Sequence, residues 1–146
     1  MKETLLTVLE NTRLADGIYR LRLAGDISAI TAPGQFVNLK LSGFFLRRPI
    51  SVCDWENGEV TLIYKVLGHG TEAMTGMAVG TALDVLTGLG NGFDLSRSGE
   101  HPLLVGGGVG IFPMISVIRE YAEEKQISAY MGFRTKAAVC GLEELR

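Results

Sequence analysis

Short runs of alternating apolar and polar residues, separated by turn residues, recur through most of this chain. A period of two places every second side chain on one face of a strand, and Asp16-Gly17 and Pro33-Gly34 are typical of tight turns. Many short strands with such turns indicate a small antiparallel barrel, which leaves no strand edge exposed. The predicted strands are residues 5–9, 18–23, 36–41, 50–54, 60–67 and 82–86, with a short helical stretch over 69–77 and a glycine-rich loop over 87–93.

The pattern changes after a polar segment at residues 96–100, which we interpret as a linker. The elements predicted beyond it are a strand (102–105), a glycine turn (106–110), an amphipathic helix (111–125) and a second strand (127–132). Residues 142–146 resemble the start of another helix. We predict two domains, residues 1–98 and 99–146. Because a nucleotide-binding sheet normally has about five or six strands, we expect the second domain to be truncated.

Charge and composition exclude several classes of protein. A net charge of -2 gives no attraction for the phosphates of nucleic acid. No apolar run approaches the roughly 18 residues that span a bilayer, and no signal peptide precedes the first strand, so we expect a cytoplasmic protein with no membrane partner. Cys53 and Cys140 lie far apart, without CxxC spacing or a nearby pair of histidines, so we expect no metal site in this chain.

The segment Arg48-Pro49-Ile50-Ser51 places a cation, a proline and a hydroxyl group in an otherwise apolar, strand-like run. Strand interiors disfavour proline and unpaired charge. An arginine can hold a phosphate, a serine hydroxyl can donate to a ring nitrogen, and open backbone beside them suits a planar ligand. A flavin fits this combination. A solvated arginine on an edge strand is the structural alternative.

A second candidate segment joins the end of a strand, Ile63-Tyr64-Lys65, to the start of a helix at Gly70 and Thr71. Glycine lets the backbone approach a ligand, the first amides of a helix favour an anionic pyrophosphate, and Thr71 adds a hydroxyl donor. The alternatives are an ordinary capped helix and, for the tyrosine, a ring that fills the barrel interior.

The third candidate is the glycine turn of the predicted βαβ unit. Its glycines are Gly106, Gly107, Gly108 and Gly110. Each costs backbone entropy on folding, so a phosphate-binding turn explains them better than a purely structural one. The turn departs from the G-x-G-x-x-G fingerprint at Ile111, and the second strand ends without an acidic residue.

Few other residues suggest chemistry. His69 and His101 lack a carboxylate, cysteine or serine partner at a meaningful spacing, so we expect both on the surface. Asp84 and Asp94 are predicted to be turn or edge residues. Any chemistry therefore belongs to a bound cofactor.

In their order, these segments resemble the ferredoxin–NAD(P) reductase superfamily and, within it, the electron-transfer subunits of class 1B dihydroorotate dehydrogenases. The segments that carry the resemblance are residues 46–54, 64–71, 86–93 and 104–110. Each is weak alone, but together they are specific. The resemblance implies a six-stranded antiparallel FAD-binding barrel followed by an incomplete nucleotide-binding βαβ domain.

The resemblance also implies roles for the candidate residues. Ser51 lies near the flavin ring and Arg48 near the phosphates, and the glycine turn takes the pyrophosphate of NAD. The residues implied to bind FAD are Arg48, Pro49, Ile50, Ser51, Ile63, Tyr64, Lys65, Gly70 and Thr71.

The implied activity is that of a flavin-dependent oxidoreductase subunit in pyrimidine biosynthesis. It passes electrons between NAD and a dihydroorotate dehydrogenase catalytic subunit, in a heterotetramer. Family members end in a cysteine-rich segment that holds a [2Fe-2S] cluster; Cys53 and Cys140 do not match it, so we expect the ligands beyond Arg146 in the full-length parent. A γ-type flavin reductase subunit of a hydrogenase, sulfide dehydrogenase or ferredoxin–NADP transhydrogenase is the alternative. Arg134 leaves NADPH open, although the family prefers NADH.

Overall fold

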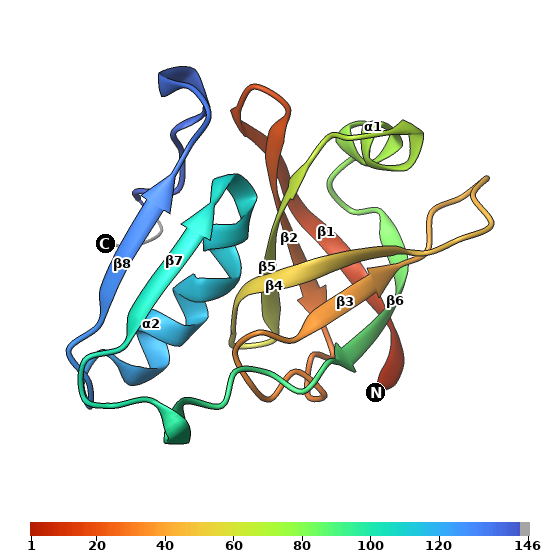
Figure 1. Ribbon diagram of the computed structural model, residues 1–146. Helices are drawn as coiled ribbons and strands as arrows, with labels where there is room; N and C mark the ends of the chain where they lie inside the picture. Colours follow the sequence, from red (N-terminus) through yellow and green to blue (C-terminus); the bar gives the residue numbers. More distant parts are fainter. Residues whose placement is uncertain (144–146) are drawn as a thin grey trace.

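The computed structural model describes residues 1–143, and its first part is a closed antiparallel barrel, as predicted (Figure 1). Around the barrel the strands follow the order β1-β2-β5-β4-β3-β6. Short turns join β1 to β2 and β4 to β5, so these neighbours in sequence also pair in space. The strands are β1 (Lys2–Ala15), β2 (Ile18–Gly25), β3 (Phe36–Leu39), β4 (Arg48–Glu56), β5 (Glu59–Lys65) and β6 (Ala82–Leu89).

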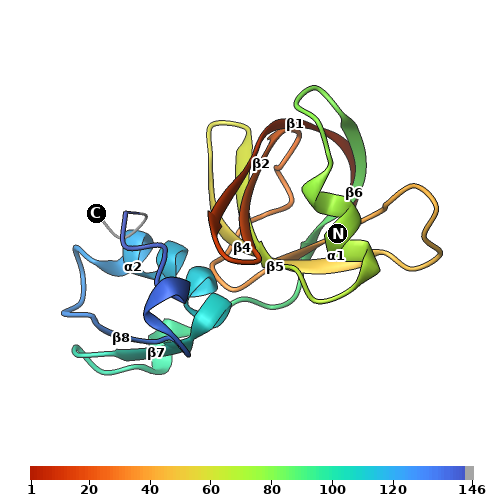
Figure 2. The ribbon, with the colours of Figure 1, turned by 90° about the horizontal axis from the view of Figure 1, so that it is seen from above.

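The alternating apolar side chains fill the barrel. Leu6 and Val8 on β1, Leu21 and Leu23 on β2, and Val85 on β6 are all fully buried. The short helix α1 (His69–Thr75) lies across one end of the barrel, and its Met74 belongs to the same apolar core (Figure 2). The period of two in the sequence therefore specifies the barrel interior.

Glycines allow the chain to leave the barrel. The expected loop over 87–93 is only partly a loop, because β6 continues to Leu89. Gly88 and Gly92 have φ of +67° and +75°. A Cβ atom on Gly88 would lie 2.4 Å from Ala29 O, and a Cβ atom on Gly92 would lie 2.9 Å from Pro33 O. These glycines are required where β6 and the exit loop cross residues 29–33, so their role is structural.

The second part of the chain is a small parallel sheet with a helix on one face. β7 (Leu103–Gly107) pairs with β8 (Ser128–Gly132), and α2 (Ile115–Tyr121) connects them (Figure 1). The outer face leaves Leu103, Val105 and Tyr130 more than half exposed. Residues 1–143 also contain three short 3-10 helices: Leu95–Arg97, Gly108–Met114 and Lys136–Ala138.

The predicted helix over 111–125 is wrong at both ends. A 3-10 helix occupies Gly108–Met114, and α2 is seven residues long. Pro113 lacks an N–H for an α-helical hydrogen bond, and Glu123 and Glu124 are unfavourable at a helix C-terminus. Of the helix expected over 142–146, residues 144–146 lie outside the described part of the chain, and Leu142 and Glu143 form a turn.

The two parts pack against each other through an apolar cluster. Ile18, Cys53 and Ile63 from the barrel contact Ile111 and Phe112. At the rim, Arg119 on α2 pairs with Asp54 and with Glu56, the latter at 3.2 Å from Nη2 to Oε2. The division between residues 98 and 99 stays a prediction, since the barrel strands end at Leu89 and β7 begins at Leu103.

No helix among residues 1–143 is both long enough and apolar enough to cross a lipid bilayer.

Candidate functional site

The barrel sheet opens between β4 and β5. The two strands pair from the hairpin only as far as Val52 and Leu62, and beyond these residues they diverge (Figure 1). Residues 48–51 of β4 still pair with β3, and residues 63–65 of β5 still pair with β2. Two of the predicted segments therefore border the same opening, each with one free backbone edge.

Pro49 and Ser51 suit this free edge. The amide of Val52 donates to Gln35 O at 3.0 Å, so by antiparallel alternation the amide of Ser51 faces the unpaired side. The nitrogen of Pro49 faces the same side, where its missing N–H costs no ladder hydrogen bond. Both side chains are exposed, whereas Ile50 packs partly against the core. The proline that looked anomalous in the sequence thus has a structural reason.

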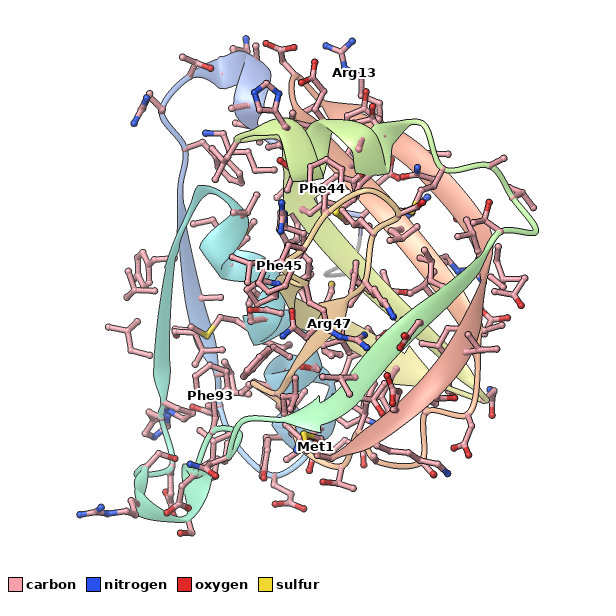
Figure 3. The ribbon with its side chains drawn as sticks, turned by 90° about the vertical axis from the view of Figure 1, so that its right-hand side faces the viewer. Met1, Arg13, Phe44, Phe45, Arg47 and Phe93 are labelled. Atoms are coloured by element: carbon pink, nitrogen blue, oxygen red, sulfur yellow. The ribbon has the colours of Figure 1, made fainter. Side chains whose placement is uncertain are left out.

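Two adjacent arginines have opposite environments. Arg47 is bidentate to Asp84, with Nη1 to Oδ1 at 3.0 Å and Nη2 to Oδ2 at 3.1 Å, and it also contacts Glu3 at 2.7 Å. Figure 3 shows Arg47 between β3 and β6. The arginine lowers the pKa of the Asp84 carboxyl through this hydrogen bonding. Asp84 is thus a structural ion-pair partner rather than an incidental edge residue.

Arg48 carries a charge that no carboxylate among residues 1–143 neutralises. Its Nη1 donates to Leu46 O at 2.6 Å, and its guanidinium lies 5.0 Å from the centre of the Phe44 ring. A carbonyl and an aromatic face orient the cation without cancelling its charge. This arrangement suits an anionic ligand.

The first turn of α1 lies directly against Arg48. A Cβ atom on Gly70 would come within 2.0 Å of Arg48 Nε, so only glycine allows this approach. The Thr71 hydroxyl accepts from the amides of Leu67 at 2.9 Å and Gly68 at 3.2 Å, and it donates to Gly68 O at 3.0 Å. Thr71 therefore shapes the turn before α1, and its proton is already used.

The side chains of 63–65 point in different directions. Tyr64 is only 2% exposed, its ring stacks on Tyr19 with centroids 5.7 Å apart, and its hydroxyl donates to Asn11 Oδ1 at 3.1 Å. Burial raises the pKa of Tyr64 to about 12. The ring thus fills the barrel interior, as in the structural alternative, and only the backbone of Tyr64 is placed to meet a ligand. Ile63 packs toward the second part of the chain, and Lys65 is exposed.

The glycine turn is built mainly from backbone. Gly106 is buried, and a Cβ atom there would lie 2.6 Å from Ile111 Cα. Gly108 has φ +52°, and Gly107, Gly108 and Gly110 face open space. Ile111, directly after the turn, belongs to the same cluster as Ile63, so the structure brings the turn beside β5.

The remaining sequence expectations concern single residues. His69 and His101 are exposed, as expected, and so is Arg134. Cys53 and Cys140 are buried free thiols, and within residues 1–143 no three histidine, cysteine or acidic side chains could hold a metal ion. Sequence reasoning missed Phe44 and Asn11; Asn11 lies beyond the predicted strand 5–9 but within the observed β1, so its role had no signal in the sequence.

A cavity of about 620 Å³ lies next to the opening, beneath the loop before β4. Its walls include Phe44, Ala73, Met77, Leu83 and Asp84, and none of the predicted site residues lines it. The predicted site is therefore an open surface beside this cavity, not the cavity itself.

Two curated proteins similar to this chain carry the same name. The chain is 38% identical over 143 residues to the dihydroorotate dehydrogenase B (NAD(+)) electron transfer subunit of Listeria innocua, covering 93% of this chain and 56% of that protein. It is 39% identical over 155 aligned positions to the subunit of the same name from Bacillus velezensis, covering 100% of this chain and 60% of that protein. The resemblance inferred from the motif order is confirmed, and the chain spans less than two thirds of these relatives. No protein-family model matches it.

Solved structures agree on the fold. An NADH-dependent reduced ferredoxin–NADP oxidoreductase superimposes with a TM-score of 0.86 at 27% identity, covering 98% of this chain and 53% of that one. Phthalate dioxygenase reductase superimposes with a TM-score of 0.82 at 23% identity, covering 98% and 47%. The barrel followed by part of an α/β domain is thus a known reductase architecture.

Proposed function

We propose that this chain is part of a flavin-dependent electron-transfer subunit that passes electrons between NAD and a dihydroorotate dehydrogenase catalytic subunit. The observation that carries the proposal is the unneutralised Arg48, held against Gly70 at an opening of the barrel sheet. The relatives named above support the identity of the partner and of NAD. A heterotetramer with that partner, and a cytoplasmic location, complete the proposal.

The residues at the opening fit FAD. Arg48 supplies the positive charge for a pyrophosphate, Gly70 lets that group approach the backbone of α1, and the Ser51 hydroxyl and amide are free for the polar edge of the flavin. Pro49, Ile50 and the backbone of 63–65 border the opening. Bound FAD would supply the redox chemistry, taking up two electrons and releasing them singly, while the chain binds and orients it.

The glycine turn fits the pyrophosphate of NAD by backbone alone. Gly107, Gly108 and Gly110 leave room for phosphate oxygens near their amides, and Gly106 permits the close contact with Ile111 that shapes the turn. Because Ile111 and Ile63 share one cluster, a dinucleotide on the turn would lie next to the proposed flavin site. A [2Fe-2S] cluster that carries electrons onward is part of the proposal for the complete protein.

Flavin titration of the full-length protein tests the proposal. We expect Arg48→Ala to raise the Kd for FAD about 10- to 100-fold, because a charge-assisted contact contributes about 1.5 to 3 kcal/mol. Arg13→Ala is the matched control, since Arg13 is exposed and already paired with Asp16. A wild-type protein that takes up no FAD would refute the proposal.

A second candidate is a flavin subunit of a ferredoxin–NADP oxidoreductase, favoured by the TM-score of 0.86 to such an enzyme. Affinity purification of the tagged protein from its own cells separates the two. We expect co-purification of a partner subunit, in a complex that reduces NAD when dihydroorotate is added; reduction that depends on ferredoxin instead would select the second candidate.

A further inference from the structure

Asn11 joins α1 to the barrel wall. From β1, its Nδ2 donates to the carbonyl oxygens of Met74 at 2.8 Å, Thr75 at 3.4 Å and Met77 at 3.2 Å. Its Oδ1 accepts the hydroxyl of Tyr64 on β5 at 3.1 Å. One partly buried amide thus connects two barrel strands with the C-terminal end of α1.

Helix α1 depends on such a contact. It has seven residues, and helices this short are unstable without tertiary support. The last carbonyl groups of a helix have no partner within it. Buried Met74 contributes the apolar contact to the barrel, and Asn11 contributes the polar one.

The same helix carries Gly70, four residues before Met74 and therefore on the same face. The space between Gly70 and the Arg48 side chain is too small for even one side-chain atom, because a Cβ atom on Gly70 would lie 2.0 Å from Arg48 Nε. A shift of the Met74 end would move Gly70 relative to the guanidinium. We propose that Asn11 is a positioning residue for the ligand site, which holds α1 where Gly70 and Arg48 form one surface for a pyrophosphate. This inference deepens the proposed function and rests on it.

Titration of the full-length protein with FAD and with riboflavin tests this role. In Asn11→Ala we expect the Kd for FAD to rise about tenfold, which matches the loss of one or two neutral hydrogen bonds. Riboflavin has no phosphate groups, so its Kd should stay within about twofold. Val85→Ala, a core change on β6, controls for general destabilisation and should not alter the ratio of the two affinities. Equal losses for both ligands in Asn11→Ala would overturn the proposal.

A double-mutant cycle tests whether Asn11 acts through Arg48. In the Arg48→Ala background, we expect Asn11→Ala to weaken FAD binding by less than about twofold, because the two residues serve one surface. Additive losses would mean that Asn11 acts elsewhere and would contradict the proposal.

Hydrogen exchange of the ligand-free protein separates this inference from the proposed function. The amide of Glu72 donates to Gly68 O at 2.9 Å in the first turn of α1. In Asn11→Ala we expect this amide to exchange about tenfold faster while amides of β2 are unchanged. If the wild type binds no FAD, the proposed function fails; unchanged exchange at Glu72 would overturn the positioning role in either case.

Discussion

Arg48 and Gly106 stand at the two proposed binding segments, and their surroundings differ in kind. Around Arg48, the group offered to a ligand is itself a side chain: a cation oriented by the Phe44 ring and by the backbone carbonyl of Leu46, beside Gly70. Around Gly106, the shape comes from backbone in contact with backbone. The first arrangement allows substitutions that alter binding without altering the fold. In the second, the conformation that would bind a ligand also holds β7 against the 3-10 helix, so fold and binding change together.

Gly106→Ala is expected to have the largest effect on stability. Its Cβ atom would lie 2.6 Å from Ile111 Cα and 2.8 Å from Ile111 N, and backbone cannot move aside as a side chain can. Overpacking of this kind costs about 1 to 3 kcal/mol. Urea unfolding measures the loss, with Gly107→Ala as the control because a Cβ atom there meets nothing within 4 Å. Equal stability of the two variants would show that the turn is looser than we describe.

Gly70→Ala is expected to weaken ligand binding without lowering the stability of the fold. Alanine is compatible with the helical backbone at this position and stabilises a helix by about 0.5 to 1 kcal/mol relative to glycine. The new methyl group would displace the Arg48 side chain, whose Nε lies 2.0 Å from the Cβ position. We therefore expect a Kd for FAD about tenfold higher, without loss of stability.

Gly76→Ala, at the other end of α1, is the control for Gly70→Ala, since its Cβ atom would make ordinary contact at 3.7 Å. Unchanged FAD affinity in Gly70→Ala would contradict the contact between Arg48 and α1 as part of the site.

The two segments also differ in how far the sequence predicts them. Alternation in the first part of the chain predicts the barrel, and the order of the Arg48, Gly70 and Gly106 segments predicts which regions come together. The sequence does not show that Arg47 rather than Arg48 is neutralised, because its partners Glu3 and Asp84 lie on other strands. The contact of Asn11 with α1 is equally remote in sequence. The amphipathic pattern predicts an α-helix, but a 3-10 helix forms at its start because Pro113 has no N–H to donate to an α-helical hydrogen bond.

Tyr64, whose ring is buried in the barrel, should make the stability of the fold depend on pH. Burial raises the pKa of Tyr64 to about 12, above the value of about 10 in an unfolded chain. Below pH 10 both states are neutral, so the contribution to stability is complete; as the pH rises from 10 to 12 only the unfolded state ionises, and stability falls. We expect a loss of about 1 kcal/mol by pH 11 from this group.

The difference between wild type and Tyr64→Phe in urea unfolding at pH 9, 10 and 11 isolates the contribution of Tyr64. Tyr130→Phe is the matched control, because Tyr130 is exposed on β8. The same pH slope in the wild type and Tyr64→Phe would mean that the Tyr64 hydroxyl is accessible to water.

The smallest expected effect concerns the contact between the two parts of the chain. Arg119 pairs with Asp54 and Glu56, but its side chain is 48% exposed, and exposed ion pairs contribute about 0.2 to 1 kcal/mol. We expect Arg119→Ala to lower the free energy of unfolding by about 0.5 kcal/mol at low salt and by nearly nothing in about 1 M NaCl, where the Debye length is about 3 Å. Glu120→Ala, at the next and also exposed position of α2, is the control. A loss several times larger, and independent of salt, would mean that the ion pairs rather than Ile63, Ile111 and Phe112 hold the glycine turn beside the barrel. The position of the glycine turn, whose own shape comes from backbone contacts, would then depend on side-chain ion pairs.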